Sequence, residues 1–174
     1  MKLLAISKND GKMTEARVHP AFLPAEHPLS SVKGSFNAVF INGDNVDDVM
    51  LYGRGAGSLP TGSAIVSDIV FAGKNDSHRR FAFEEVDADD STFATDFVTE
   101  YYLRFVASNT GEALSKIVAL IEASDVAVEK AITKGNNIVV ITGKSKESCM
   151  QDIISRIKGL SSVDSLGALV RIEK

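Results

Sequence analysis

Four glycines within twelve residues form the part of the chain best suited to approach a ligand. The run GRGAGSLPTGSA (53–64) follows an expected strand and precedes an expected helix. Backbone amides at such a helix N-terminus can hold an anion, for example a phosphate. However, Ser58 occupies the position where a G-x-G-x-x-G fingerprint needs its third glycine, and no Gly-Lys-Ser/Thr ending follows. The pattern leaves two interpretations open, a tight strand-to-helix turn or a loop that faces a ligand.

The other reactive side chains do not form a recognisable catalytic or metal-binding set. His19 and His27 each precede a proline, and His78 lies in a basic turn. None is spaced with other ligands as a metal site requires, so no metal site is predicted. The hydroxyl side chains near the glycines are Ser58, Thr61, Ser63 and Ser67. They lack a G-x-S-x-G elbow, which argues against a serine hydrolase, and Asp68 is predicted to be a surface or packing carboxylate.

Composition limits the class of protein. The chain has 174 residues, 44% of them hydrophobic and 24% charged, with a net charge of −4. These values are typical of a soluble globular protein and argue against a nucleic-acid or anionic-membrane partner. The one cysteine, Cys149, allows no intramolecular disulfide and is expected to be a buried small hydrophobe. Without a signal peptide or an apolar run of about 18 residues, a cytoplasmic location is expected.

The C-terminal part has the more regular pattern. Apolar residues recur at helical spacing in GEALSKIVALIEAS (111–124) and again after Ser145, where Gly159 is expected to end the helix. Strands are predicted at 101–108, at 126–133 and 137–144 around a Gly-Asn-Asn turn, and at 167–174. The order β-α-β-β-α-β predicts a ferredoxin-like unit. Because its hairpin carries no aromatic residue, Tyr101, Tyr102 and Phe105 are predicted to be core or interface residues rather than an RNA-stacking platform.

The N-terminal part is predicted to be a sheet with one clear helix. Strands are expected in KLLAISK and KMTEARVH around the turn at 9–11, and in FNAVFING (36–43) and DVMLYG (48–53). The proline-rich run VHPAFLPAEHPL (18–29) is expected to be irregular. A helix is expected to follow Pro60, and RRFAFEE (79–85) to form a last strand. An acidic polar segment then separates this part from the next.

Residues 16–70 resemble homoserine dehydrogenase, in the later part of its catalytic region. The resemblance is carried by the ordered blocks R-V-H-P-x-x-x-P-x-x-H-P-L, G-x-F-N-A-V-F and Y-G-x-G-A-G-x-x-P-T-x-S-A-x-x-x-D. From Tyr101 to the C-terminus the chain looks like the ACT domain found in many bacterial members. We therefore expect an α+β chain made of part of the catalytic and dimerisation domain (1–90), a linker (91–99) and an ACT regulatory domain (100–174).

The resemblance implies NAD(P)-dependent interconversion of L-homoserine and L-aspartate 4-semialdehyde, in the biosynthesis of threonine, methionine and isoleucine. The family's Rossmann domain and catalytic lysine are expected upstream of Met1. The chain is thus expected to be a C-terminal fragment, inactive alone, that carries no catalytic residue and does not bind NAD or NADP tightly. Gly57 is carried over as a cofactor contact, and Gly53 and Gly55 as residues that shape the turn, because glycine admits close backbone approach.

The ACT-like part departs from the family where an amino-acid effector binds. Family members commonly have Asp-x-Pro-Gly-Val-Leu there, and this chain has Asn109, Thr110, Gly111, Glu112, Ala113 and Leu114 in turn. Glu112 in place of the glycine adds bulk and negative charge near the position of an effector carboxylate. The resemblance places Asn109, Glu112, Ala113 and Leu114 at the effector-binding positions. The hypothesis is that threonine or another amino acid binds weakly or not at all.

The resemblance also implies a homo-oligomer, a dimer or a tetramer, formed through the catalytic-domain sheet and the ACT domain. An alternative of another class remains open, namely a stand-alone amino-acid-sensing or oligomerisation module of the ACT type. The preference between NAD and NADP is set by residues of the expected upstream domain.

Overall fold

The computed structural model describes residues 1–45, 47–75 and 92–174. The chain divides into two compact units, the first formed by Met1–Pro24 together with Ala88–Lys174 and the second by Ala25–Asp87. The predicted strand at 79–85 and His78 lie outside the described residues.

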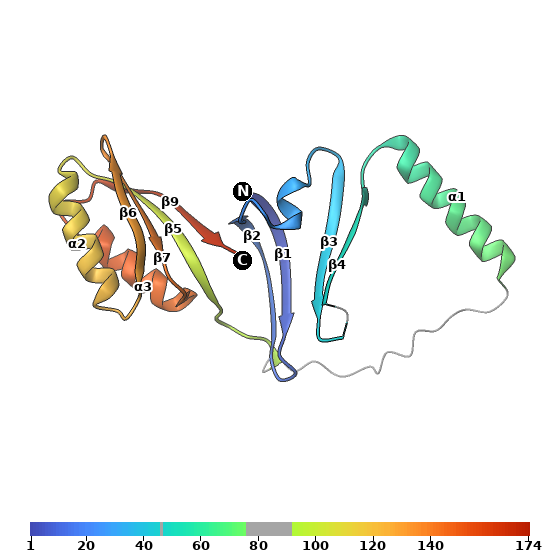
Figure 1. Cartoon of the computed structure of the whole chain (residues 1–174), viewed down its shortest axis with the longest axis horizontal. Coiled ribbons are helices and arrows are strands. Elements are labelled where there is room, and N and C mark those ends of the chain that lie inside the picture. The colour runs from blue at the N-terminus through green and yellow to red at the C-terminus, as the bar shows by residue number, and fades with distance from the viewer. Residues whose placement is uncertain (46, 76–91) are drawn as a thin grey trace. The chain divides into compact units, whose positions relative to one another are not determined.

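The C-terminal part of the first unit alternates strands and helices. The elements are β5 (Val98–Val106), α2 (Thr110–Glu122), β6 (Val128–Lys134), β7 (Asn137–Thr142), β8 (Ser145–Lys146), α3 (Glu147–Lys158) and β9 (Ser165–Ile172). The four long strands lie in the order β9-β5-β7-β6, and all neighbours are antiparallel. Both helices cover one face of this sheet (Figure 1). This is the βαββαβ arrangement that the sequence pattern predicts.

The core of this arrangement lies between the helices and the sheet. Along β5 every second residue is buried, and Tyr101, Leu103 and Phe105 are fully enclosed. The helices bury one stripe each, comprising Ala113, Ile117 and Ile121 of α2 and Met150, Ile153, Ile154 and Ile157 of α3. These stripes have the spacing that predicted the helices, and Cys149 is partly buried against the same core.

The N-terminal hairpin of the first unit consists of β1 (Lys2–Asn9) and β2 (Thr14–Phe22), which pair over eight residues. Its turn is closed by the side chains of Asn9 and Asp10, which accept hydrogen bonds from the backbone amides of 11–13. β2 also pairs with β9, in parallel. One sheet therefore contains strands from both sides of the predicted boundary at 91–99, and β5 already begins at Val98.

The predicted irregularity of 18–29 is wrong for its first five residues. Val18 to Phe22 continue β2 through Pro20, which lies opposite Leu3 of β1. On its other side β2 pairs with β9 only at Ala21 and Phe22, so Pro20 has no partner strand on that side. Proline is tolerated at such an open strand edge because no ladder hydrogen bond is lost there.

The second unit holds the glycine-rich run. Its elements are the short 3-10 helix η1 (Pro28–Ser31), the antiparallel strands β3 (Phe36–Gly43) and β4 (Asp47–Arg54), and the helix α1 (Ser58–Lys74). The hairpin and the helix that starts at the glycines are as predicted, with Pro60 in the first turn of α1. None of the described helices is long and apolar enough to cross a membrane.

Candidate functional site

The three glycines of the candidate cofactor loop occupy three different backbone positions. Gly53 lies within β4 opposite Asn37, and a Cβ atom added there would meet nothing within 4 Å. Gly55 lies in the connection to α1, and its amide donates to the carbonyl of Ser35 at 3.2 Å. A Cβ at Gly55 would lie 1.5 Å from Nδ2 of Asn37, so the Asn37 side chain closes over this position.

Gly57 is the position where the backbone itself requires glycine. It precedes α1 with φ 120° and ψ 148°, a conformation that residues with a Cβ rarely adopt. Its carbonyl accepts the first helical hydrogen bond, from the amide of Thr61 at 3.1 Å. No side chain of the described residues caps the first turn of α1. The first turn of α1 therefore has backbone amides without a side-chain acceptor in the described part of the chain, and such amides can hold an anion.

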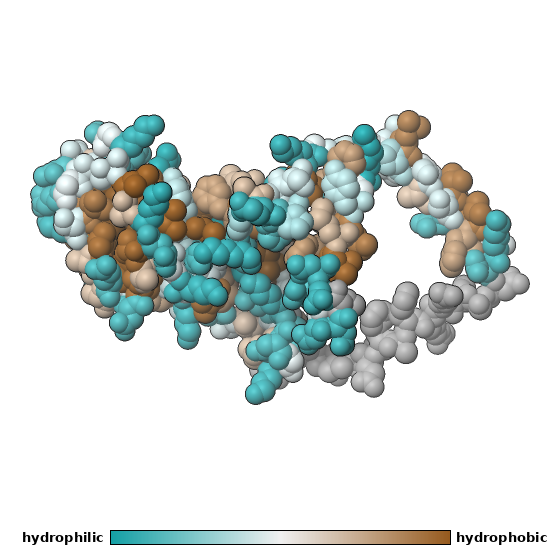
Figure 2. Space-filling view, in the orientation of Figure 1, coloured by the Kyte–Doolittle hydropathy of each residue, from teal (hydrophilic) through white to brown (hydrophobic). Residues whose placement is uncertain are grey.

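Helix α1 exposes its apolar side chains. None of its residues is buried, and the apolar side chains of Leu59, Ile69 and Phe71 are at least 60% exposed. Figure 2 shows hydrophobic side chains along the visible surface of this helix. A helix of this kind is marginal in water unless its apolar stripe is covered.

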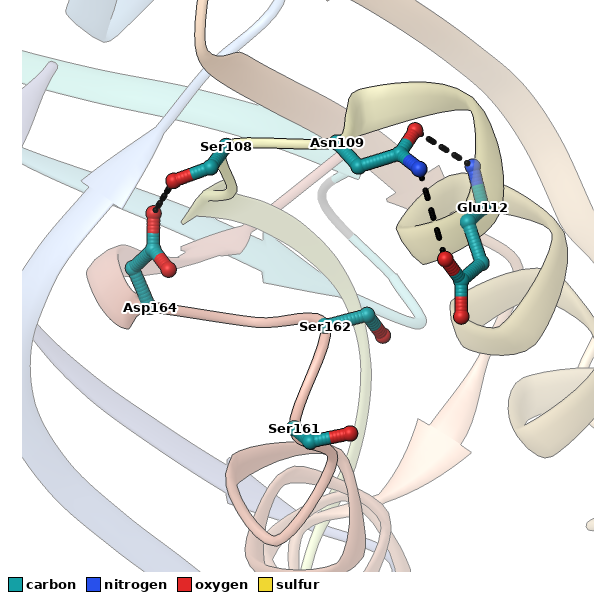
Figure 3. Close-up of a pocket in the computed structure, with 6 residues that line it drawn as sticks. All are labelled: Ser108, Asn109, Glu112, Ser161, Ser162 and Asp164. Atoms are coloured by element: carbon teal, nitrogen blue, oxygen red, sulfur yellow. Dashed lines mark hydrogen bonds between the residues drawn. The ribbon is translucent and has the colours of Figure 1, made fainter.

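The candidate effector residues lie at a shallow pocket in the first unit, between the β5–α2 turn and the α3–β9 loop. Its volume is about 210 Å³, and its lining residues are Ser108, Asn109, Glu112, Ser161, Ser162 and Asp164 (Figure 3). The hydroxyl of Ser108 donates to the carboxylate of Asp164 at 2.9 Å. The Oγ atom of Ser162 is buried and has no hydrogen-bond partner among the described residues. Two carboxylates and three hydroxyls make a lining that favours a cation over an anion.

Two of the four predicted effector residues are brought to this pocket and two are not. Asn109 caps α2 by accepting from the amide of Glu112, and its own amide group donates to the Glu112 carboxylate at 3.3 Å. Glu112 also pairs with Lys116 one turn later at 2.6 Å. Ala113 is fully buried, and Leu114 packs against the core. Glu112 thus has a local structural role that accounts for its presence in the first turn.

A polar cluster that the sequence analysis did not single out surrounds Phe97. The guanidinium of Arg17 lies 4.4 Å from the Phe97 ring centre, and that of Arg171 lies 5.5 Å from it. The ring of His19 stacks on the same side chain with its centre at 6.2 Å. Since Arg17 donates to Nε2 of His19, that nitrogen accepts, and Nδ1 carries the proton that is donated to the carbonyl of Pro20.

Glu147, the first residue of α3, accepts hydrogen bonds from the part of this cluster that lies next to the core. Arg171 donates to it through two nitrogens, and the Tyr101 hydroxyl donates at 2.9 Å. Burial alone would raise the pKa of Glu147, but these hydrogen bonds and that of Gln151 outweigh it and lower the pKa. Burial and the nearby Glu147 carboxylate raise the pKa of Tyr101 well above its usual value. Tyr101 therefore acts as a neutral donor and Glu147 as a carboxylate at physiological pH.

The residues of this cluster were not predictable because they are distant in sequence. Arg17, Phe97, Glu147 and Arg171 come from β2, the segment before β5, α3 and β9.

The single-sequence signal that could have pointed to the pocket is the βαββαβ order itself, which brings the β5–α2 and α3–β9 connections to one end of the sheet. Within the described residues, no group of three potential metal ligands occurs.

Comparisons with known proteins agree with the fold. The family model described as homoserine dehydrogenase matches residues 1–70. Curated homoserine dehydrogenases from Neisseria gonorrhoeae and Bacillus subtilis are 33% and 32% identical over 99% of this chain, which spans 43% and 42% of their lengths. A solved homoserine dehydrogenase structure from Thiobacillus denitrificans has a TM-score of 0.84 at 31% identity, over 99% of this chain and 42% of that one.

The matched relatives are dehydrogenases, which are oxidoreductases, and the matches extend over both units. In sequence and in fold the chain is similar to homoserine dehydrogenases: the family model matches its first 70 residues, and the relatives match over nearly its whole length. It spans less than half the length of the relatives reported above.

Proposed function

We propose that this chain supplies the loop that approaches the cofactor, together with a regulatory unit, to an enzyme that interconverts L-homoserine and L-aspartate 4-semialdehyde with NAD or NADP. The observation that carries the proposal is the backbone conformation of Gly57, with φ 120°, directly before the exposed and uncapped first turn of α1. The family blocks around it support the same role. A bound nicotinamide cofactor would supply or accept the hydride.

The residues of the loop fit a cofactor in three respects. Gly57 brings the backbone close without a side chain, and the first turn of α1 offers amide donors. Gly55 shapes the approach, because the side chain of Asn37 fills the space that a larger residue at 55 would need, whereas a Cβ at Gly53 would meet nothing within 4 Å. These groups bind and orient a ligand, and none of them transfers a proton. We therefore propose that the catalytic lysine belongs to a part of the enzyme other than this chain.

A chimaera tests this proposal. The residues of the Neisseria gonorrhoeae enzyme that precede its matched region are fused to this chain, and homoserine-dependent reduction of NAD or NADP is measured. We expect turnover by the chimaera and none by this chain alone. Gly57→Val should raise the KM for the cofactor at least about tenfold. Gly53→Ala should leave the KM unchanged, because a Cβ there meets nothing within 4 Å. A chimaera that melts cooperatively but is inactive contradicts the proposal.

We also propose that the exposed apolar surface of the second unit is covered by protein in the assembled enzyme. Val39 lies opposite Leu51 and Ile41 opposite Val49, so four apolar side chains share one exposed face of the β3–β4 hairpin. An isolated two-stranded sheet is at best marginally stable in water, and a second copy of the chain would cover this face. Light scattering should give the mass of a dimer or larger species, and Leu51→Lys should reduce it to that of a monomer. A monomeric mass for the wild-type chain contradicts the proposal that protein covers this face.

A second candidate function, a stand-alone amino-acid-sensing module of the ACT type, is favoured by the four-stranded C-terminal arrangement but not by the charge of its pocket. The lining carboxylates of Glu112 and Asp164 oppose the carboxylate of an amino-acid effector. We expect calorimetric titration with threonine to show no binding at micromolar concentrations. Micromolar binding that Asp164→Asn changes would favour the sensing function, and Ser155→Ala outside the pocket is the control.

A further inference from the structure

The N-terminal hairpin (β1 and β2) is joined to the rest of the first unit by few backbone contacts. β1 pairs with β2 over eight residues, whereas β2 pairs with β9 only at Ala21 and Phe22. Beyond this pairing, the amide of Glu173 donates to the carbonyl of Phe22, and the amide of Ala94 to that of Thr14, each at 2.9 Å. The ladder that holds the hairpin together is thus far longer than the one that holds it to the sheet.

Apolar burial adds little to this attachment. Of the hairpin's residues, only His19 and Ala21 are buried. Within the C-terminal arrangement, by contrast, β5 and both helices share a continuous core. Since burial of apolar surface is the main favourable contribution to folding, the hairpin gains much less from its contacts than the core elements do.

Besides the ring contacts of Phe22 with Tyr102 at 5.2 Å and of His19 with Phe97 at 6.2 Å, the attachment consists of charged side chains centred on Glu173. This carboxylate accepts hydrogen bonds from the guanidinium of Arg17 on β2, from Lys8 on β1 at 3.3 Å and from the hydroxyl of Thr99 on β5 at 3.3 Å. Arg17 also pairs with Glu15 at 2.6 Å and lies over Phe97. Hydrogen bonds between ionised groups of this kind are stronger than neutral ones.

One donor of the cluster is not satisfied in this arrangement. The side chain of Arg17 is only 7% exposed, and its Nη2 atom is buried without a hydrogen-bond partner among the described residues. A buried donor without an acceptor costs free energy, and opening the contact returns that donor to water. The missing hydrogen bond of Arg17 in the attached arrangement therefore favours release of the hairpin.

We infer that the N-terminal hairpin is a detachable element, held to the C-terminal part of the first unit through the Glu173–Arg17 ion pair and able to open while β5, β7, α2 and α3 stay folded. The hairpin belongs to the part of the chain that the family model matches, and the elements from β5 to β9 lie outside that match. A ligand that binds one of the two forms better than the other would therefore shift the position of the hairpin.

Amide hydrogen exchange of the full chain tests the inference. In Glu173→Gln we expect peptides of β1 and β2 to exchange about tenfold or more faster, and peptides of β5 and β7 to be unchanged. Glu100→Gln is the matched control, because Glu100 has a similarly buried side chain, 13% exposed against 12%, but pairs with the exposed Lys174. Unchanged exchange of the hairpin in Glu173→Gln, or an equal rise in all strands, would overturn the inference.

The wild-type chain provides a second measurement that does not depend on a variant folding. In exchange experiments at increasing sub-denaturing urea, β1 and β2 should open with a lower free energy and a weaker urea dependence than β5 and β7. If all four strands exchange through one opening with the same free energy and urea dependence, the hairpin is part of the cooperative core and the inference fails.

Discussion

Removing the Glu147 carboxylate should be one of the most destabilising single changes outside the apolar core. In Glu147→Ala the fully buried Tyr101 hydroxyl loses its acceptor, which costs about 1–3 kcal/mol. Arg171 also loses its paired carboxylate. Breaking a fully buried ion pair costs about 3–5 kcal/mol, and the 21% and 17% exposure of these side chains places this pair well below that range. The two losses overlap, so we expect a decrease of about 2–4 kcal/mol in the free energy of unfolding.

Urea titration followed by tyrosine fluorescence is a suitable assay, because two of the three tyrosines, Tyr101 and Tyr102, lie in β5. The matched control is Asp152→Ala on the same helix, where the pair with Arg156 is exposed and 3.8 Å long, and about 0–1 kcal/mol is expected. Adding Tyr101→Phe to Glu147→Ala should cost less than Tyr101→Phe alone. Equal effects of Glu147→Ala and Asp152→Ala, or strict additivity with Tyr101→Phe, would refute the reasoning.

Two further predictions concern the glycine loop and the carboxylates. Gly57→Ala should lower the stability of the β4–α1 connection by about 1–3 kcal/mol, because alanine is strained at a φ of 120°. Far-UV circular dichroism should then show less helix than for the control variant Gly53→Ala. Hydrogen bonds from Arg171 and Arg17 outweigh burial and lower the pKa values of Glu147 and Glu173. These groups therefore stabilise the fold above the usual glutamate pKa, and this stability is lost as the pH falls through the lowered values. Urea midpoints should decline below about pH 4, and less so in the Glu147→Gln, Glu173→Gln double variant; an identical decline contradicts the assignment.

Local sequence patterns were sufficient wherever one element determines its own environment. The stripes of α2 and α3 and the alternation in β5 follow from helical and strand periods, and the structure contains these elements where the patterns predict them. Gly57 was singled out by the family resemblance as a cofactor contact, and its φ of 120° is a finding of the structure.

The predictions that failed or were incomplete concern contacts between distant segments. The irregularity expected after Val18 was wrong because pairing with β1 overrides the proline signal. The four residues expected near an effector stay a prediction; Asn109 and Glu112 line the pocket, whereas Ala113 and Leu114 pack against the core. The sequence-based division of the chain at 91–99 stays a prediction, although the sheet includes strands from both of its sides.

The sequence alone determined the family resemblance, the βαββαβ order and the glycine-rich run before α1, because these depend on residues that are close together along the chain. Tertiary structure alone decided that β2 joins β9, that Arg17 and Arg171 lie over Phe97, and that Glu173 accepts from three strands. The physical reason is that ion pairs and ring contacts depend on distance in space, and no local period encodes which of the chain's charged residues will meet.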